Sequence, residues 1–251
     1  MVKDISDFIV YLEIEKNFSH HTTKGYLTDL RQFHDYLKGD EILGGEDIDI
    51  TCVDQMLVRS FMRDLYLKKA KKVTIARKLA AIRAFFKYLL RNGRIAANPA
   101  ELVHAPTPER HIPAVLSVDE MLSVLTISFR DEPLELRNKG IVELFYSAGI
   151  RLSELAGLDI EDLNFAQGLA KIRGKGRKER IVPIGGPAIT SIQSYLKRRA
   201  ELLKNRAEES LQGRPLFLNS KGQRLTVRSI ARLVDRIVLQ SGISRKISPH
   251  S

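Results

Sequence analysis

The sequence of 251 residues has no tryptophan and one cysteine, Cys52. One thiol cannot form an internal disulfide or a multi-cysteine zinc site, so a disulfide-rich secreted protein and a zinc finger are excluded. We expect Cys52 to be a small buried side chain. No apolar run reaches the roughly 18 residues that cross a bilayer, and Lys3, Asp4 and Asp7 interrupt any signal segment. The sequence predicts a soluble, cytoplasmic protein.

Acidic residues are in deficit: 30 Asp and Glu stand against 41 Lys and Arg, and the net charge is +11. The excess is local, because residues 59–94 hold twelve basic residues and one acid, Asp64, whereas residues 1–53 are net acidic. A dense cationic surface gains free energy by neutralising phosphates and releasing counterions, which favours nucleic acid as partner. A membrane surface is disfavoured, because no basic helix here has an exposed aromatic tip.

Helical spacing dominates the first hundred residues. Two stripes recur at three- and four-residue steps and predict the core faces of two helices: Tyr26, Leu30, Phe33 and Leu37, then Ile75, Leu79, Ile82, Phe86 and Leu89. Arg83, Lys87 and Arg91 follow four-residue steps on another side of the second helix. A solvated basic face and a phosphate-binding face both fit this pattern, and the scarcity of acids favours the second.

The helical pattern stops near Asn98-Pro99, and prolines punctuate the residues that follow. This composition predicts a helical domain over 1–103 and a linker over 104–116. A second domain is predicted over 117–251, since Ser117 and Glu120 have the spacing of a capping box at a helix start.

The second domain is predicted to be mainly helical with a small β-hairpin. Ile141, Val142, Leu144 and Phe145 predict a nearly all-apolar, buried helix that ends at Gly149. Ser153 can cap the next helix. Two β-prone runs, Leu169 to Arg173 and Arg180 to Ile184, flank a glycine-rich basic turn. Another amphipathic helix carries an apolar stripe opposite Arg228, Arg232 and Arg236.

Three features of this domain could carry chemistry. Arg151 lies at the elbow in YSAGIRLSELAGL, where an arginine taken alone is more often a structural residue that binds backbone carbonyls than a catalytic one. Lys175 lies at the turn of KIRGKGRKER. This segment lacks the GxxxxGK[ST] spacing of a nucleotide-binding loop, so ATP binding is not expected. A hairpin turn rich in Lys and Arg is usually exposed to solvent and has no further role. His250 follows a proline in SPHS, and an isolated histidine is often inert.

Together and in this order, AGIRLSEL, RGKGRKERIVPI and ISPH resemble the catalytic domain of the tyrosine recombinases, most closely the Xer type. SHHTTKGYLTDLRQF (19–33) and TIARKLAAIRAFFKYL (74–89) resemble that family's helical core-binding domain. The resemblance implies a mainly α protein whose two domains bind duplex DNA, and which cuts and rejoins strands through a 3′-phosphotyrosine. It implies no cofactor and no metal.

The resemblance also implies roles for individual residues. Arg151 would stabilise charge on the phosphate oxygens, Lys175 would protonate the 5′-oxygen leaving group, and His250 would donate to the phosphate or handle the nucleophile's proton. Glu154 would orient the arginine turn. The basic residues that we expect to contact DNA are Lys71, Lys72, Arg77, Lys78, Arg83, Lys87, Arg173, Arg177 and Arg228.

The sequence departs from the family pattern because it stops at Ser251, before the second arginine of HxxR and before the family's nucleophilic tyrosine. We therefore expect a C-terminally truncated chain that binds DNA without cutting it, and that forms tetramers with itself or a paralogous recombinase only when full length. Tyr195 is the tyrosine nearest to His250, but it reads as part of an ordinary helix. Two alternatives stay open: a non-catalytic DNA-binding accessory protein, and a phage or transposon integrase instead of a chromosome-dimer resolvase.

Overall fold

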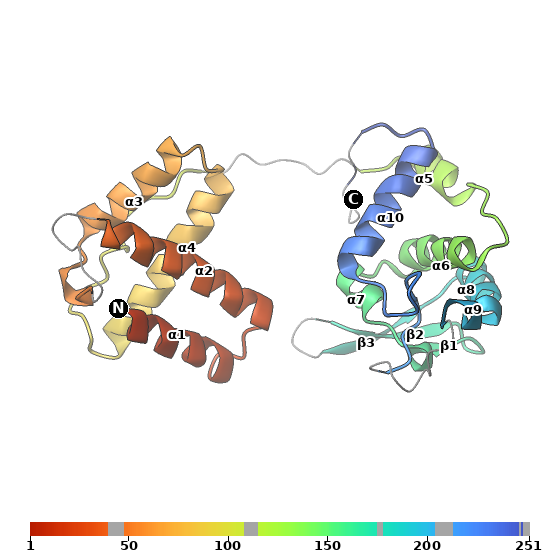
Figure 1. Cartoon of the computed structure of the whole chain (residues 1–251), viewed down its shortest axis with the longest axis horizontal. Helices are drawn as coiled ribbons and strands as arrows, with labels where there is room; N and C mark the ends of the chain where they lie inside the picture. The colour runs from red at the N-terminus through yellow and green to blue at the C-terminus, as the bar shows by residue number, and fades with distance from the viewer. Residues whose placement is uncertain (40–47, 108–114, 175–177, 204–212, 246, 248–251) are drawn as a thin grey trace. The chain divides into compact units, whose positions relative to one another are not determined.

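The computed structural model describes residues 1–39, 48–107, 115–174, 178–203, 213–245 and 247. The chain separates into two compact units, Met1–His111 and Ile112–Ser251, each considered by itself (Figure 1). The domain boundaries at 103 and 117 stay predictions, since much of the predicted linker is outside the described residues. No described helix is long and apolar enough to span a membrane.

The first unit is a helical bundle. Its elements are α1 (Val2–Ile14), α2 (His20–Lys38), the 3₁₀ turn η1 (Ile50–Cys52), α3 (Gln55–Leu67) and α4 (Lys72–Arg91). The predicted stripes face inward, because Leu30, Phe33 and Leu79 are fully buried and α2 packs against α4 (Figure 1). Phe33 contacts Phe61 and Phe86 ring to ring, at centroid distances of 5.2 and 6.3 Å. Helical periodicity therefore identified this core correctly.

The expectation for Cys52 is wrong. Its side chain is exposed at the end of η1. The buried side chains of this segment are the larger apolar ones on either side, Ile50 and Val53.

The second unit combines helices with a small sheet. The elements are α5 (Val118–Leu125), α6 (Pro133–Ala148), α7 (Leu152–Ala156), η2 (Ile160–Asp162), β1 (Leu163–Asn164), β2 (Leu169–Arg173), β3 (Glu179–Pro183), α8 (Gly186–Arg198), α9 (Ala200–Leu203) and α10 (Val227–Gln240). The three strands are antiparallel in the order β1-β2-β3, and Arg173 and Glu179 form the last pair of β2 and β3. The mainly α fold with a small hairpin is therefore confirmed, with β3 one residue earlier than predicted.

Helix α6 packs against α8 at the centre of this unit (Figure 1). Tyr195 on α8 is fully buried and stacks on Phe217 at a centroid distance of 5.8 Å. Its hydroxyl accepts a hydrogen bond of 3.1 Å from the backbone N–H of Leu218. Tyr195 is thus a core residue whose oxygen is committed to the backbone.

Candidate active site

Arg151 lies in the elbow between α6 and α7. Gly149 ends α6 in the left-handed conformation, with φ of 56°, as the sequence predicted. Arg151 itself is the N-cap of α7, with extended backbone dihedrals. The prediction that Ser153 caps this helix is wrong, because the Glu154 side chain accepts the Arg151 backbone N–H at 2.8 Å and fixes the N-cap two residues earlier, at Arg151. The Arg151 side chain is 66% exposed.

Glu154 joins this elbow to the hairpin. Its side chain is only 3% exposed and accepts a bond of 3.1 Å from the Arg151 guanidinium. Arg180 on β3 donates to both carboxylate oxygens, each at 2.8 Å. The hydrogen bonds from Arg180, followed by those from the backbone and guanidinium of Arg151, lower the pKa of Glu154 to about 2. The carboxylate therefore stays charged at neutral pH and orients both arginines.

The turn that follows β2 begins beside this carboxylate. A Cβ atom on Gly174 would lie 3.4 Å from Glu154 Oε1 and 3.4 Å from Arg180 Nη1, so the backbone passes close to the ion pair. Gly174 donates its N–H to the carbonyl of Lys178 at 2.7 Å, which extends the β2–β3 pairing by one rung. Lys175 follows Gly174 directly, and Lys175, Arg177 and His250 all lie outside the described residues.

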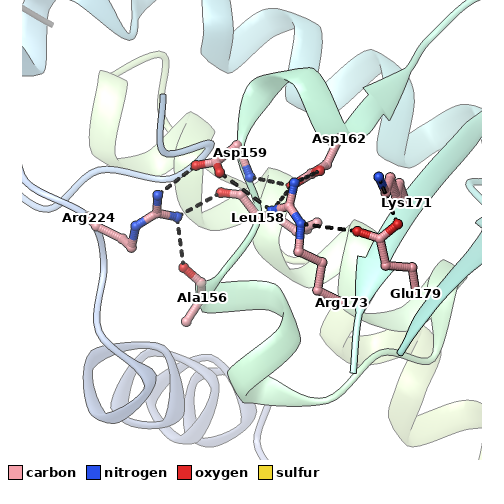
Figure 2. Close-up of polar contacts among 8 residues, drawn as sticks. All are labelled: Ala156, Leu158, Asp159, Asp162, Lys171, Arg173, Glu179 and Arg224. Carbon is pink, nitrogen blue, oxygen red and sulfur yellow. Dashed lines mark hydrogen bonds and ion pairs between the residues drawn. The ribbon is translucent and has the colours of Figure 1, made fainter. Parts of the chain in front are cut away.

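A second cluster of ions supports the β2 side of the hairpin (Figure 2). Arg173 donates to the two oxygens of Asp162 at 2.7 and 3.1 Å, and its guanidinium lies 3.6 Å from Asp159. The cross-strand pair of Lys171 and Glu179 lies beside it at 2.8 Å.

Arg224 extends this cluster to the segment before α10 (Figure 2). It donates to Asp159 at 2.6 Å, to the carbonyl of Leu158 at 3.1 Å and to that of Ala156 at 3.4 Å. Ala156 is the last residue of α7, so Arg224 satisfies a carbonyl at the end of the helix that Arg151 begins.

Six of the predicted DNA-binding residues lie on α4 or directly before it, and one lies on α10. Lys71, Lys72, Arg77 and Lys87 are exposed, as is Arg228 in the first turn of α10. Arg77 is also bonded to Asp29 of α2.

Two of these predicted DNA-binding residues are committed to internal contacts. The ammonium of Lys78 is buried and donates to Asp29 at 2.8 Å and to Gln32. Arg83 donates to the carbonyl of Ala100 at 3.0 Å and to that of Val103. These contacts join the helices of the first unit to each other and to the segment that follows α4.

Four residues of the site were not singled out from the sequence: Arg180, Asp159, Asp162 and Arg224. The spacing of Asp159 and Asp162 was a usable signal, because an acid three residues after a polar residue is typical of a capping box, and Asp162 does accept the Asp159 N–H at 2.9 Å. Their pairing with Arg173 and Arg224 depends on the tertiary fold. Within the described part of the chain, no group of three His, Cys, Asp or Glu residues could hold a metal ion.

Comparison with known proteins agrees with this architecture. Residues 114–251 match the model of the "Phage integrase family", and residues 5–93 match "Phage integrase, N-terminal SAM-like domain". The tyrosine recombinase XerC of Syntrophus aciditrophicus is 47% identical over 98% of this chain and 80% of its own length. That of Pelobacter propionicus is 39% identical over 100% and 79%.

Solved structures of low sequence identity share the fold. XerH site-specific recombinase bound to palindromic difH substrate gives a TM-score of 0.72 at 20% identity, covering 98% of this chain and 69% of that one. A lambda integrase dimer bound to a COC′ core site gives 0.69 at 14% identity, covering 100% and 82%. On the family match and the close relatives along its whole length, the chain belongs to the phage integrase family, among the tyrosine recombinases of the Xer type.

Proposed function

We propose that the protein is a site-specific recombinase that breaks and rejoins duplex DNA, with Arg151, Lys175 and His250 at its active site. The observation that supports this proposal most directly is the position of Glu154. Its buried carboxylate bonds Arg151 at the start of α7 and Arg180 on β3, the strand that follows the turn with Lys175. One charged group thereby orients an exposed arginine and the strand that follows the lysine-bearing turn.

The proposed reaction exchanges one phosphodiester for another. A tyrosine oxygen attacks phosphorus, its proton passes to His250, and the bond from phosphorus to the 5′-oxygen breaks. The ammonium of Lys175 gives its proton to that leaving oxygen, and the product is a 3′-phosphotyrosine with a free 5′-hydroxyl. Reversal with a different 5′-hydroxyl rejoins the strands. The bond count is unchanged, so the exchange needs no external source of energy.

Arg151 suits the role of charge stabiliser. Negative charge grows on the non-bridging oxygens as phosphorus becomes five-coordinate, and a planar guanidinium can donate to two such oxygens. Among the described residues, Glu154 contacts one of its guanidinium nitrogens, and the side chain is otherwise largely exposed. The fork is therefore held in orientation and still accessible to a phosphate.

We propose that phosphate contacts come from Lys71, Lys72, Lys87 and Arg228. All four lie on the solvent side of α4 or α10, or at the start of α4. Lys78 and Arg83 are left out because their donors are already bonded inside the first unit. Arg77 shares its charge with Asp29, which reduces what it can give to a phosphate.

The relatives named XerC support a role in chromosome dimer resolution, in which two recombination sites on one circular chromosome are joined and exchanged. We propose the same role here, with duplex DNA and a tetramer of recombinase subunits as the reacting assembly. Recombination between two copies of a chromosomal site on one plasmid tests this role, since deletion of the intervening DNA is its direct product. A chain that binds such sites but never exchanges them would instead be an accessory factor.

We further propose that none of the seven tyrosines in this sequence is the nucleophile. Burial raises the pKa of Tyr195, which works against the phenolate that the attack requires, and its oxygen accepts the Leu218 N–H. A polypeptide of these 251 residues is expected to bind duplex DNA and form no covalent adduct. An adduct mapped to any of the seven would contradict this.

A substrate with sulfur in place of the bridging 5′-oxygen tests the central assignment. Lys175→Ala in the full-length protein is expected to slow cleavage of ordinary DNA by roughly 100-fold or more. A thiolate leaves without protonation, so the sulfur substrate is expected to restore the rate, while Arg151→Ala stays slow on both substrates. Lys178→Ala on the same hairpin is the matched control and is expected to cleave like the wild type. Equal loss of binding and cleavage in Lys175→Ala would make it a DNA-binding residue instead.

A further inference from the structure

Two arginines hold the hairpin next to its turn, one on each strand. Arg180 of β3 bonds both oxygens of Glu154, and Arg173 of β2 bonds both oxygens of Asp162. Both acceptor carboxylates are nearly inaccessible, at 3% exposure each. Two bidentate contacts on opposite strands fix the direction in which a two-stranded ribbon leaves the domain, whereas one contact would let it pivot.

The contact on β2 has further support. Asp159 lies between two guanidinium groups, 2.6 Å from Arg224 and 3.6 Å from Arg173 (Figure 2). Asp159 also donates its backbone N–H to Asp162 at 2.9 Å, so it helps to orient the carboxylate that Arg173 binds. Loss of the Asp159 charge would therefore weaken its contacts with both Arg173 and Arg224, while the backbone bond to Asp162 would remain.

Arg224 connects this contact to α7. Its two bonds to the carbonyls of Ala156 and Leu158 fix the turn that leaves α7, and its bond to Asp159 fixes the next residue. The same short stretch of chain therefore begins with Arg151 and ends at the carboxylates that hold β2. Arg224, from the segment before α10, thus fixes the position of the hairpin relative to the turn that carries Arg151.

We infer that Arg224 and Asp159 are positioning residues for proton donation by Lys175. Arg224 holds Asp159, Asp159 and Asp162 hold Arg173, and Arg173 lies two residues before Lys175. The inference rests on the proposed function, since it needs Lys175 as the general acid. It also makes Arg173 a support of the hairpin instead of the phosphate contact that its charge alone suggests.

Asp159→Asn in the full-length protein is the sharpest test, because it removes the charge and keeps the size of the side chain. Single-turnover cleavage of ordinary half-site DNA is expected to fall by about 10- to 100-fold, the loss that a misplaced catalytic group produces. The substrate with a bridging 5′-sulfur is expected to be cleaved within about threefold of the wild-type rate, since it needs no proton. Half-site affinity and melting temperature are measured for every variant.

Two further variants make the test selective. Arg224→Gln removes the guanidinium that holds Asp159, and its cleavage rate is expected to recover with the sulfur substrate in the same way. Glu161→Gln is the matched control, because Glu161 is an acid of the same turn whose partner at 3.1 Å, Arg214, is not on the hairpin. It is expected to cleave both substrates like the wild type.

The outcomes separate the inference from the proposed function. Equal slowing on both substrates, or unchanged cleavage by Asp159→Asn, would overturn the inference while sulfur still rescues Lys175→Ala. If a variant binds the half-site more weakly and the sulfur substrate does not restore its cleavage rate, the residues of this cluster contribute to DNA binding instead. If the sulfur substrate does not restore cleavage by Lys175→Ala, Lys175 is not the general acid, and the role assigned to it in the proposed function is wrong.

Discussion

Lys78 and Asp29 form an ion pair of 2.8 Å inside the first unit, where their side chains are 6% and 2% exposed. The pair joins α4 to α2. A buried charge that loses its partner is strongly destabilising, because its desolvation is no longer offset. This basic residue of the cation-rich stretch therefore has a structural role.

Lys78→Met is expected to lower the free energy of unfolding by about 3 kcal/mol, since it leaves Asp29 with Arg77 alone. Duplex affinity of the folded protein is expected to change by less than about twofold, because no phosphate contact is lost. Urea unfolding and half-site titration measure the two quantities. Lys87→Met on the exposed side of the same helix is the control and is expected to do the reverse. A Lys78→Met protein that unfolds like the wild type but binds DNA weakly would refute the structural role.

Glu154→Gln is expected to destabilise the second unit in a pH-dependent way. The pKa of Glu154 is about 2 in the folded protein and near its ordinary value of 4.5 when unfolded. Its charge therefore contributes stability that is fully present above about pH 5 and is lost as the pH falls toward 2. We expect the variant to be less stable at neutral pH by on the order of 2 kcal/mol, and the difference to shrink on acidification.

Urea unfolding of both proteins at several pH values between about 7 and 3 checks this. Glu161→Gln, a substitution of the same kind on the neighbouring turn, is expected to leave the stability curve unchanged. A gap between wild type and Glu154→Gln that stays constant with pH would mean that lost packing, and not charge, is responsible.

Much of the fold was predictable because its signals are local. The apolar stripe through Leu30 and Phe33 determines which face of α2 is buried, and Ser117 and Glu120 do form the capping box at α5. Gly149 ends α6 because a residue without a Cβ atom adopts the left-handed backbone conformation easily. Each of these depends on residues within about one turn of each other.

The details of the site were not predictable in the same way. Arg180 reaches Glu154 across 26 residues of sequence, and Arg224 reaches Asp159 across 65. Sequence charge cannot distinguish an arginine with such a partner from one that faces DNA. The same limit explains why Lys78 and Arg83 were grouped with exposed cations of α4.

Tyr195→Phe tests whether this tyrosine has only a structural role. Removing its hydroxyl leaves the buried N–H of Leu218 without its acceptor, which costs about 1–2 kcal/mol. Thermal unfolding is expected to show that loss, while cleavage and adduct formation by the full-length protein stay at the wild-type level. Tyr146→Phe, at an exposed position, is expected to change neither. Loss of the adduct in Tyr195→Phe with unchanged stability would identify it as the nucleophile.

Salt dependence distinguishes the exposed cations from those committed to internal pairs. Each phosphate neutralised in duplex DNA adds about 0.9 to the magnitude of the slope of log affinity against log salt. Lys87→Ala and Arg228→Ala are each expected to reduce that magnitude by about one and to weaken binding of all sequences to a similar extent. Arg83→Ala is expected to leave the slope unchanged, because its guanidinium bonds the carbonyls of Ala100 and Val103. Half-site titrations between about 50 and 200 mM salt give these slopes. A slope that falls equally in all three variants would show that an internal contact does not prevent a cation of α4 from meeting the phosphates, and the division between structural and DNA-binding cations would then be wrong.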